Sequence, residues 1–494
     1  FITDGILNNL MGGTVSLEAA FGNISYSGGS LHDFNNMGTL RNATPTGYAI
    51  IDVVLNNTGT INVETSELRL QALNKNLTDG VYNVLPGANF FWNGPITCEG
   101  TLTGTLDGPI TWGNQVTVAP GTSATFDFSG TVGVNWTASI LTGGGNLTNL
   151  GVMNLTSSVT KSIIGDTTFN NEGIINIASN GDLFITQGVL NNQATGTIDF
   201  QDNFGDFSFS GGTSHIFNNA GVLIKTAGTN ASNLYVETTN TGTIEVASGT
   251  LLFSGPNTLN NTASGIIKGI GTIDLPAPAD FVNNGTFAPG ASPGTLSVIG
   301  DFESTASSVL DVELNGYTPS TEYDVLAITG NAILEGNVNI SMGFEGFIND
   351  TFTVATTTGT ITTCNLLAPN TPVHNGIEYE FSTDCSTNPN QLVLTIIQKT
   401  DIAPPTVVTQ DITVYLDPTG NVSITPAQID NGTTDNVSTP ANLAYMLDVT
   451  SFSCADIGDN TVTLTVTDEA GNSANASATV TVLGTDTTYT GGGW

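Results

Sequence analysis

Two loops near the C-terminus carry the oxygen-rich side chains that a cation site needs. The first loop holds Asp430, Asn431, Asp435 and Asn436, and the second holds Asp468, Glu469 and Asn472. Carboxylate and amide oxygens are the hard ligands that calcium prefers, and loops at one end of a β-sandwich converge. The sequence therefore predicts a calcium site with the ligands Asp430, Asn431, Asp435, Asp468 and Glu469. The alternative is that these residues form turns through Asx hydrogen bonds. No other cofactor is required.

The four cysteines are too few for a disulfide scaffold and lack the spacing of a zinc site. Cys364 and Cys385 bracket one short segment, and in an oxidising compartment we expect a local disulfide between them. Cys98 and Cys454 fall in different predicted domains, where a lone cysteine usually behaves as a small buried residue.

Catalysis on a polysaccharide would require clustered carboxylates with a cation nearby. The best group is Asp199, Asp202 and Asp206, and the next basic residue along the chain is Lys225. The histidines, His32, His215 and His374, lie far apart and do not accompany a Ser or Cys nucleophile. We interpret the acidic residues as scattered over an exposed face, and we predict no catalytic residue.

The charge balance excludes two classes of partner. Asp and Glu number 43 against 7 Lys and Arg, which gives a formal net charge of −36. Nucleic acids and anionic membrane surfaces are bound through clustered Lys and Arg, and here these residues are scattered. No apolar stretch approaches the roughly 18 residues of a membrane helix, so we expect no membrane insertion.

A repeated Asn-Asn-x-Gly unit followed by a β-branched run indicates the secondary-structure elements that position the candidate residues named above. Its key Asn recurs at intervals of about 21 residues; the positions are Asn36, Asn57, Asn149, Asn171, Asn192, Asn219, Asn240, Asn261 and Asn284. Short alternating segments separated by Gly, Asn and Thr predict strands and turns. A fixed period of this kind indicates a solenoid, here an all-β parallel β-helix over residues 1–296. Asn stacked on Asn from coil to coil would satisfy the turns.

A longer repeat suggests that the solenoid grew by duplication of a block. Residues 5–40 align without a gap to residues 188–223, and both copies carry a His in register, His32 and His215. Phe1 then falls inside a coil, so we expect further protein before it.

The residue pattern of the stretch 287–342 differs from that of the repeats before it. Its turn residues, Pro289, Gly290, Ser292, Pro293 and Gly294, lead into strands and a Tyr323-Asp324 pair. This pattern resembles the last coils and cap of autotransporter-like passenger domains. The resemblance implies that the solenoid closes here, with last coils and a β cap over residues 297–400.

Ala403, Pro404 and Pro405 indicate a linker. From there the sequence alternates, with turn residues every 8 to 12 positions, and predicts a β-sandwich of about seven strands over 401–484. The segments PPTVVTQDITVYLDPTGNVSITP and FSCADIGDNTVTLTVTDEAGNSANASATVTV resemble the hyalin-repeat, immunoglobulin-like module, which recurs in secreted and surface proteins of Bacteroidetes. The family often has further cysteines where this chain has Thr409 and Val437, so a family disulfide is not expected. Residues 485–494 would link to a further module.

Together these features predict a non-enzymatic segment of an extracellular adhesin or surface filament, a rod-like spacer and binding surface exported, as the resemblance implies, by the type IX route. Its partners would be an extracellular glycan or surface, or further copies of itself. Two alternatives stay open: a self-assembling extracellular fibre subunit and a secreted polysaccharide-active β-helix enzyme. Glycan binding would use exposed aromatic side chains, for which the candidates are Trp92, Trp112, Tyr26 and Phe209; the alternative for these is packing in the core.

Overall fold

The computed structural model describes residues 1–178, 181–254, 258–277 and 281–484. Strands account for 57% of the chain and helices for 2%, which confirms the all-β fold class. The chain divides into two compact units, each described by itself below. The first comprises residues 1–339, 352–369 and 383–394, and the second comprises residues 340–351, 370–382 and 395–494. The predicted further module at 485–494 lies outside the described residues.

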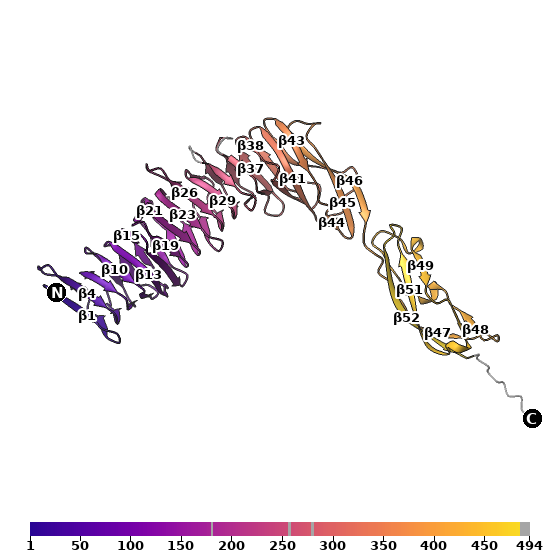
Figure 1. Cartoon of the computed structure of the whole chain (residues 1–494), viewed down its shortest axis with the longest axis horizontal. Coiled ribbons are helices and arrows are strands. Elements are labelled where there is room, and N and C mark those ends of the chain that lie inside the picture. The colour runs from indigo at the N-terminus through magenta and orange to yellow at the C-terminus, as the bar shows by residue number, and fades with distance from the viewer. Residues whose placement is uncertain (179–180, 255–257, 278–280, 485–494) are drawn as a thin grey trace, which may run out of the picture. The chain divides into compact units, whose positions relative to one another are not determined.

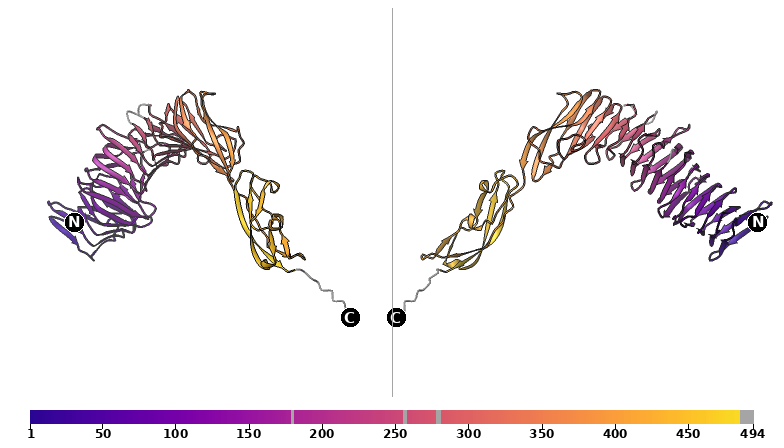
Figure 2. Two further views of the ribbon diagram at one scale, coloured as in Figure 1. Left: turned by 45° about the vertical axis from the view of Figure 1, so that its right-hand side comes forward. Right: turned by 180° about the vertical axis from the view of Figure 1, so that it is seen from behind.

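The first unit is a parallel β-solenoid of about 13 turns with about 22 residues per turn, which confirms the predicted fold and its period. Each coil contributes strands to three columns, and every column grows by parallel pairing with the next coil. In Figures 1 and 2 the strands of this unit stack in sequence order.

The first column contains β1 (Gly5–Asn9), β4 (His32–Asn36), β7 (Val54–Asn57), β10 (Lys75–Thr78), β13 (Ile96–Thr105), β15 (Val116–Thr117), β18 (Ser139–Thr142), β21 (Lys161–Asn171), β23 (Leu183–Asn192), β25 (Phe207–Ser208), β28 (Ala231–Leu234), β31 (Thr250–Phe253), β34 (Thr272–Asp274), β37 (Thr295–Ile299), β40 (Val325–Ile328) and β42 (Thr351–Thr357). The second column contains β2 (Thr14–Leu17), β5 (Thr39–Asn42), β8 (Thr60–Val63), β11 (Val81–Val84), β16 (Ser123–Ser129), β19 (Asn146–Asn149), β26 (His215–Asn219), β29 (Glu237–Asn240), β32 (Leu259–Asn261) and β35 (Phe281–Asn283). The long strands β13, β21 and β23 contribute to both columns.

The third column contains β3 (Asn23–Ser25), β6 (Tyr48–Asp52), β9 (Glu67–Leu70), β12 (Asn89–Trp92), β14 (Ile110–Trp112), β17 (Val134–Trp136), β20 (Val152–Leu155), β22 (Ile174–Ile177), β24 (Thr197–Phe200), β27 (Val222–Lys225), β30 (Thr243–Val246), β33 (Ile266–Gly269), β36 (Thr286–Pro289) and β39 (Val309–Leu314). Towards the end of the solenoid, β38 (Phe302–Glu303), β41 (Ala332–Met342) and β43 (Ile361–Leu367) pair in parallel with one another.

The repeated motif forms the corner between two strands. Its second Asn is buried, and its Gly packs backbone against backbone on the coil before: a Cβ at Gly59 would lie 2.2 Å from the carbonyl oxygen of Gly38. No other residue type fits that approach, because real Cβ atoms do not come so close to a carbonyl. In the last motif the buried residue is Asn283 rather than the predicted Asn284, because Asn283 is the one that accepts from Asn261.

The interior of the solenoid is apolar, since alternate side chains of each strand point inward. Leu, Ile, Val and Phe dominate, and the largest buried side chains include Trp92, Trp112 and Trp136. These three pair in register in the third column, and the rings of Trp112 and Trp136 stack with centroids 4.2 Å apart. The aromatic stack fills the part of the solenoid in which the Asn motif is missing.

The second unit contains β44 (Val373–His374), which pairs antiparallel with β45 (Ile377–Asp384), and then the end of β46 (Gln391–Asp401). A four-stranded sheet follows, in the order β47 (Ile412–Tyr415), β52 (Ser473–Leu483), β51 (Gly458–Thr467), β49 (Ala444–Leu447). A two-stranded sheet pairs β48 (Asn421–Ser423) with β50 (Ser451–Ser453). The helices are short: α1 (Pro426–Ile429), η2 (Pro440–Asn442) and η3 (Cys454–Asp456).

One apolar core lies between these two sheets, with Ile429, Val462 and Leu464 fully buried in it. Six strands are formed here among the described residues, where about seven were predicted. The two-sheet arrangement suits a small β-sandwich, and the hyalin-repeat, immunoglobulin-like assignment stays a prediction. None of the helices in the described parts of the chain has the length and apolar character to cross a membrane.

Candidate metal centre in the second unit

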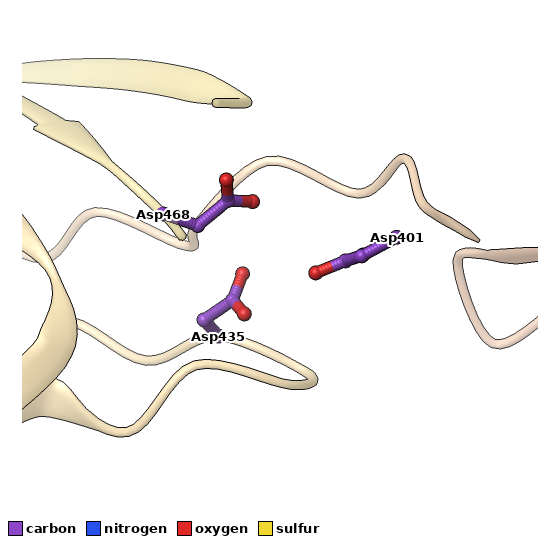
Figure 3. Close-up of side chains that lie close together, drawn as sticks. All are labelled: Asp401, Asp435 and Asp468. Atoms are coloured by element: carbon purple, nitrogen blue, oxygen red, sulfur yellow. The ribbon is translucent and has the colours of Figure 1, made fainter. Parts of the chain in front are cut away.

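Three carboxylates converge at one end of the two-sheet part of the second unit. Asp401 is the last residue of β46, Asp435 lies in the loop after α1, and Asp468 follows β51 directly. One oxygen from each lies within 4.8 Å of the oxygens from the other two. Figure 3 shows the three side chains pointing toward a common space. We call Asp401, Asp435 and Asp468 the acidic cluster.

Hydrogen bonds fix the outer oxygen of two of these carboxylates. Oδ1 of Asp401 accepts from the side-chain amide of Asn436 at 3.2 Å and from the backbone N–H of Ala403 at 3.2 Å. Oδ2 of Asp435 accepts from the N–H groups of Val437 at 3.0 Å and Ser438 at 2.7 Å. The other oxygen of each, Oδ2 of Asp401 and Oδ1 of Asp435, is buried and has no hydrogen-bond partner.

Asp468 is the most deeply placed of the three. Only 6% of the residue is exposed, and both carboxylate oxygens accept from Asn472, at 2.7 Å from its N–H and at 2.8 Å from its side-chain amide. Burial alone raises the pKa of Asp468, but the hydrogen bonds from Asn472, Gly471 and Ala470 outweigh it and hold the pKa below its usual value. Asp468 therefore stays ionised in the folded protein at neutral pH.

The loops predicted from the sequence do converge, but with a different set of carboxylates. Asp435 and Asp468 belong to the acidic cluster, and the predicted Asp430 and Glu469 do not. Asp430 accepts from the N–H of Thr433, Asn431 donates its backbone N–H to Val408, and the N–H of Glu469 donates to Ser438. The predicted neighbours Asn436 and Asn472 lie beside the cluster as hydrogen-bond donors.

Sequence reasoning missed Asp401 because it stands alone at the end of a strand. The available signal was its place two residues before Ala403 of the Ala403-Pro404-Pro405 segment, where the chain leaves β46 for the next sheet. A carboxylate at such a junction faces whichever loops pack against it, and local spacing does not identify those loops.

The predictions for three of the four cysteines are confirmed, and the prediction that Cys454 is a small buried residue is wrong. Cys364 and Cys385 form a disulfide within the first unit. Cys98 is buried in the solenoid, where burial raises the pKa of its thiol and keeps it protonated. Cys454 is exposed, and its thiol donates to the carbonyl oxygen of Gly420.

The acidic residues that were weighed for catalysis serve as local hydrogen-bond acceptors. Asp199 accepts from Thr226 and Gln201, and Asp206 accepts from the backbone and side chain of Asn233. Asp202 accepts from the N–H of Asn203, and its backbone carbonyl accepts from the ammonium of Lys225. Lys225 is fully buried, so it is not accessible to a polysaccharide.

The aromatic candidates for glycan binding fall into two groups. Trp92 and Trp112 are completely buried, which confirms for both the alternative of packing in the core. Tyr26 stacks on His32 with ring centroids 4.6 Å apart, and Phe209 stacks on His215 at 3.8 Å. These pairs occupy equivalent positions of the two repeated blocks, so the repeated histidines pair with aromatic rings. His374 lies in β44, within hydrogen-bond distance of Asn375.

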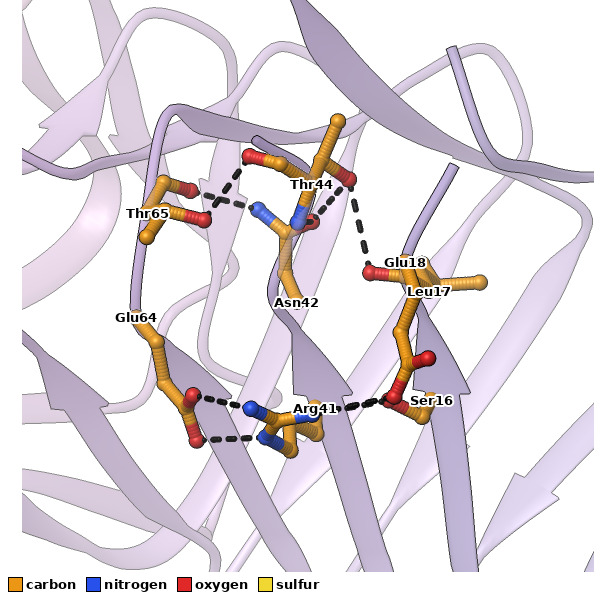
Figure 4. A network of polar contacts seen from close by, with 8 residues as sticks. All are labelled: Ser16, Leu17, Glu18, Arg41, Asn42, Thr44, Glu64 and Thr65. Carbon is orange, nitrogen blue, oxygen red and sulfur yellow. Dashed lines mark hydrogen bonds and ion pairs between the residues drawn. The ribbon is translucent and has the colours of Figure 1, made fainter. Parts of the chain in front are cut away.

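All seven basic residues have structural partners. Arg41 joins three coils, because its guanidinium pairs with Glu18 on one side and Glu64 on the other (Figure 4). Arg69, Lys268 and Lys399 pair with Glu67, Glu245 and Glu345. Lys75, Lys161 and Lys225 donate to backbone carbonyls instead. The cations stabilise the fold, and they do not form a basic patch.

A scan of protein-family models and a search of curated protein sequences both find no match. The fold places the chain in the broad class of parallel β-solenoid proteins, here with a small two-sheet region that follows the solenoid.

Proposed function

We propose that this chain is a non-enzymatic segment of an extracellular adhesin or surface filament, in which the solenoid serves as a spacer and a binding surface. A solenoid gains its stability from contacts between neighbouring coils, so its length is set by the number of repeats. Long lateral faces, rather than one closed pocket, are what such a fold offers to a partner.

The observation that carries this proposal is the unbroken stacking of the coils. The first column pairs strand on strand in parallel from β1 to β42. Buried Asn side chains link the corners of successive coils, and apolar and aromatic side chains fill the interior. These features give the solenoid its length and rigidity.

The disulfide between Cys364 and Cys385 supports an oxidising compartment. Structural disulfides persist outside the cytosol and are rare within it. The extracellular location, and export by the type IX route that the hyalin-repeat resemblance implies, are part of the same proposal.

Immunogold electron microscopy of the producing cells, with antibody raised against this chain, tests the proposal. We expect label on the cell surface or on cell-attached fibres. Label confined to soluble material in the culture supernatant would contradict it, and the secreted polysaccharide-active enzyme would then become the first hypothesis. That hypothesis predicts release of reducing or unsaturated ends from a panel of glycans.

A further inference from the structure

We propose that Asp401, Asp435 and Asp468 bind one calcium ion, which joins the end of β46 to two loops of the sheets that follow. The site lies wholly within the second unit. This inference goes beyond the proposed function and does not depend on it, because it rests on the chemistry of the cluster alone.

The first observation is the charge of the surroundings. From Thr400 to Trp494 the sequence holds 11 Asp and Glu and no Lys, Arg or His. The nearest basic residue along the chain, Lys399, bonds to Glu345 and lies over the rings of Phe347 and Tyr379. Three carboxylates thus lie together in a stretch of chain whose own residues provide no positive charge to offset their repulsion.

The second observation is independent of the first and concerns hydrogen bonding. Oδ2 of Asp401 and Oδ1 of Asp435 are buried and unpartnered, although the other oxygen of each is held by two donors. A buried charged oxygen with no partner is strongly unfavourable unless a cation or a donor satisfies it. Both free oxygens belong to residues of the acidic cluster, so one ion bound between these residues would satisfy both.

The ligand set favours calcium among the common cations. Carboxylate oxygens suit the hard ions, calcium and magnesium, better than transition metals, which favour imidazole or thiolate. Oxygens on opposite sides of a calcium ion are about 4.6–5.2 Å apart, and about 4.0–4.2 Å apart around magnesium. The cluster oxygens lie no more than 4.8 Å from one another, a separation that three ligands of one calcium ion can adopt. Calcium also accepts an irregular shell completed by water.

The hydrogen bonds around the cluster prepare it for the ion. Asn472 donates to the carboxylate of Asp468 and also to the backbone carbonyl of Asp401 at 3.2 Å. Asn436 donates to the carboxylate of Asp401 and to the backbone carbonyl of Asn375 at 3.0 Å. These amides hold the three segments in register before an ion binds. Calcium would then restrict the Ala403-Pro404-Pro405 segment.

The test is calcium titration of the full chain after treatment with EDTA and dialysis. Isothermal titration calorimetry is done in about 0.15 M NaCl, which screens diffuse attraction to the acidic surface. Because extracellular modules bind calcium with Kd of about 10⁻⁴–10⁻³ M, CaCl₂ is taken to about 10 mM. We expect one calcium ion per chain and, in differential scanning calorimetry, a higher midpoint for the transition of the second unit. Magnesium should bind more weakly.

Two variants and a matched control assign the site. Asp401→Asn and Asp435→Asn keep the size of the side chain but remove one negative charge from the cluster. Each should weaken calcium binding at least about tenfold, since even the loss of a hydrogen-bond partner of a metal ligand costs about that much. Glu469→Gln removes a charge beside Asp468 but outside the cluster, and it should bind calcium as the wild type does.

Absence of saturable calcium binding by the wild-type chain would overturn the proposal. So would wild-type affinity in the Asp401→Asn and Asp435→Asn variants, or an equal loss in Glu469→Gln. Circular dichroism checks that each variant is folded, and if one does not fold, the other variant and the wild-type titration still decide.

Discussion

Two buried lysines close corners of the solenoid in the same way. The ammonium of Lys75 donates to the carbonyl oxygens of Gln71 and Leu73, and that of Lys161 donates to those of Ser157 and Val159. In both cases the acceptors lie four and two residues earlier, in the turn that leads into a first-column strand. Each lysine donates to two carbonyls of the turn, at the cost of burying a charge.

That cost makes stability depend on pH. Burial lowers the pKa of Lys75 to about 8, from the 10.5 of a free lysine. Between these values the unfolded chain binds more protons than the folded chain, so the free energy of unfolding rises with pH. Replacing Lys75 with Met removes this contribution. We expect the stability advantage of the wild type over Lys75→Met to grow by about 2 kcal/mol between pH 8 and 10.

Urea unfolding of the solenoid, followed by the fluorescence of its buried tryptophans, measures this difference at each pH. Lys268→Met is the control, because the Lys268 side chain is 42% exposed and pairs with Glu245. The difference between Lys75→Met and the wild type should change more over this range than the difference between Lys268→Met and the wild type. A constant difference for Lys75→Met would show that Lys75 titrates in the folded chain as it does in the unfolded one.

At the scale of the strand and turn, Asn-Asn pairs that stack on one another in successive coils form two ladders that run in opposite directions. The buried Asn donates forward, as from Asn171 to Asn192 and from Asn192 to Asn219. The neighbouring, partly buried Asn donates backward, from Asn191 to Asn170 and from Asn218 to Asn191. The inner ladder also donates to backbone carbonyls of the next strand, such as that of Val222. The inner ladder thus satisfies polar groups at corners that water cannot reach.

The two ladders should differ in their contribution to stability. Asn192 is 1% exposed, and Asn192→Ala leaves Asn219 and the carbonyl of Val222 without their donor inside the protein. We expect a loss of about 2–4 kcal/mol in the free energy of unfolding, the sum of one or two unsatisfied buried groups. Asn191→Ala is the matched control, since water replaces its partners, and it should cost under about 1 kcal/mol. Urea unfolding of both variants checks this, and equal losses would contradict the assignment of the inner ladder.

The disulfide between Cys364 and Cys385 is the other stabilising feature at this scale. It closes a loop with a sequence separation of 21 residues, for which loop-closure entropy gives about 3 kcal/mol. We expect Cys364→Ser with Cys385→Ser to lower the free energy of unfolding by that amount. Dithiothreitol should lower the wild type to the same level and leave the double variant unchanged. Cys454→Ser, at the exposed thiol, is the control, and a similar loss there would contradict the disulfide's role.

Over the whole molecule, the periodic elements could be predicted and their positions around the axis could not. The Asn-Asn-x-Gly motif identifies corners because only Gly fits the backbone contact and Asn satisfies the turn, both local properties. The two copies of the long repeat, however, place their ladders in different columns: Asn9, Asn36 and Asn57 lie in the first, and Asn192 and Asn219 in the second. The change occurs where the motif is missing, through long strands such as β13 that pair in both columns.

The acidic cluster shows the same limit of prediction from local sequence. Asp435 and Asp468 could be predicted because Asp and Asn gather in their loops, while Asp401 joins them only through the path of the chain. Long-range packing of this kind leaves no signal in local spacing. The disulfide could be predicted because its two cysteines bracket a single short segment.

The net charge of −36 should make the stability of the chain depend on ionic strength. The seven cations are already paired or buried, as Arg41 is between Glu18 and Glu64, so most carboxylates have no cationic partner. Folding brings these charges closer together, and salt screens their repulsion. We expect the midpoints of thermal unfolding to rise as NaCl increases from about 0.01 to 0.3 M, a range over which the Debye length falls from about 30 Å to under 10 Å.

Differential scanning calorimetry in EDTA separates this general effect from calcium binding. Arg41→Gln removes the cation between two carboxylates. The midpoint of its thermal unfolding should therefore lie furthest below that of the wild type at low salt and approach it at high salt. Asn191→Ala, which leaves the charge unchanged, should keep a constant offset from the wild type. Midpoints that fall with added NaCl would mean that attractive ion pairs outweigh the repulsion, and the unpaired carboxylates would then lie too far apart to destabilise the folded chain.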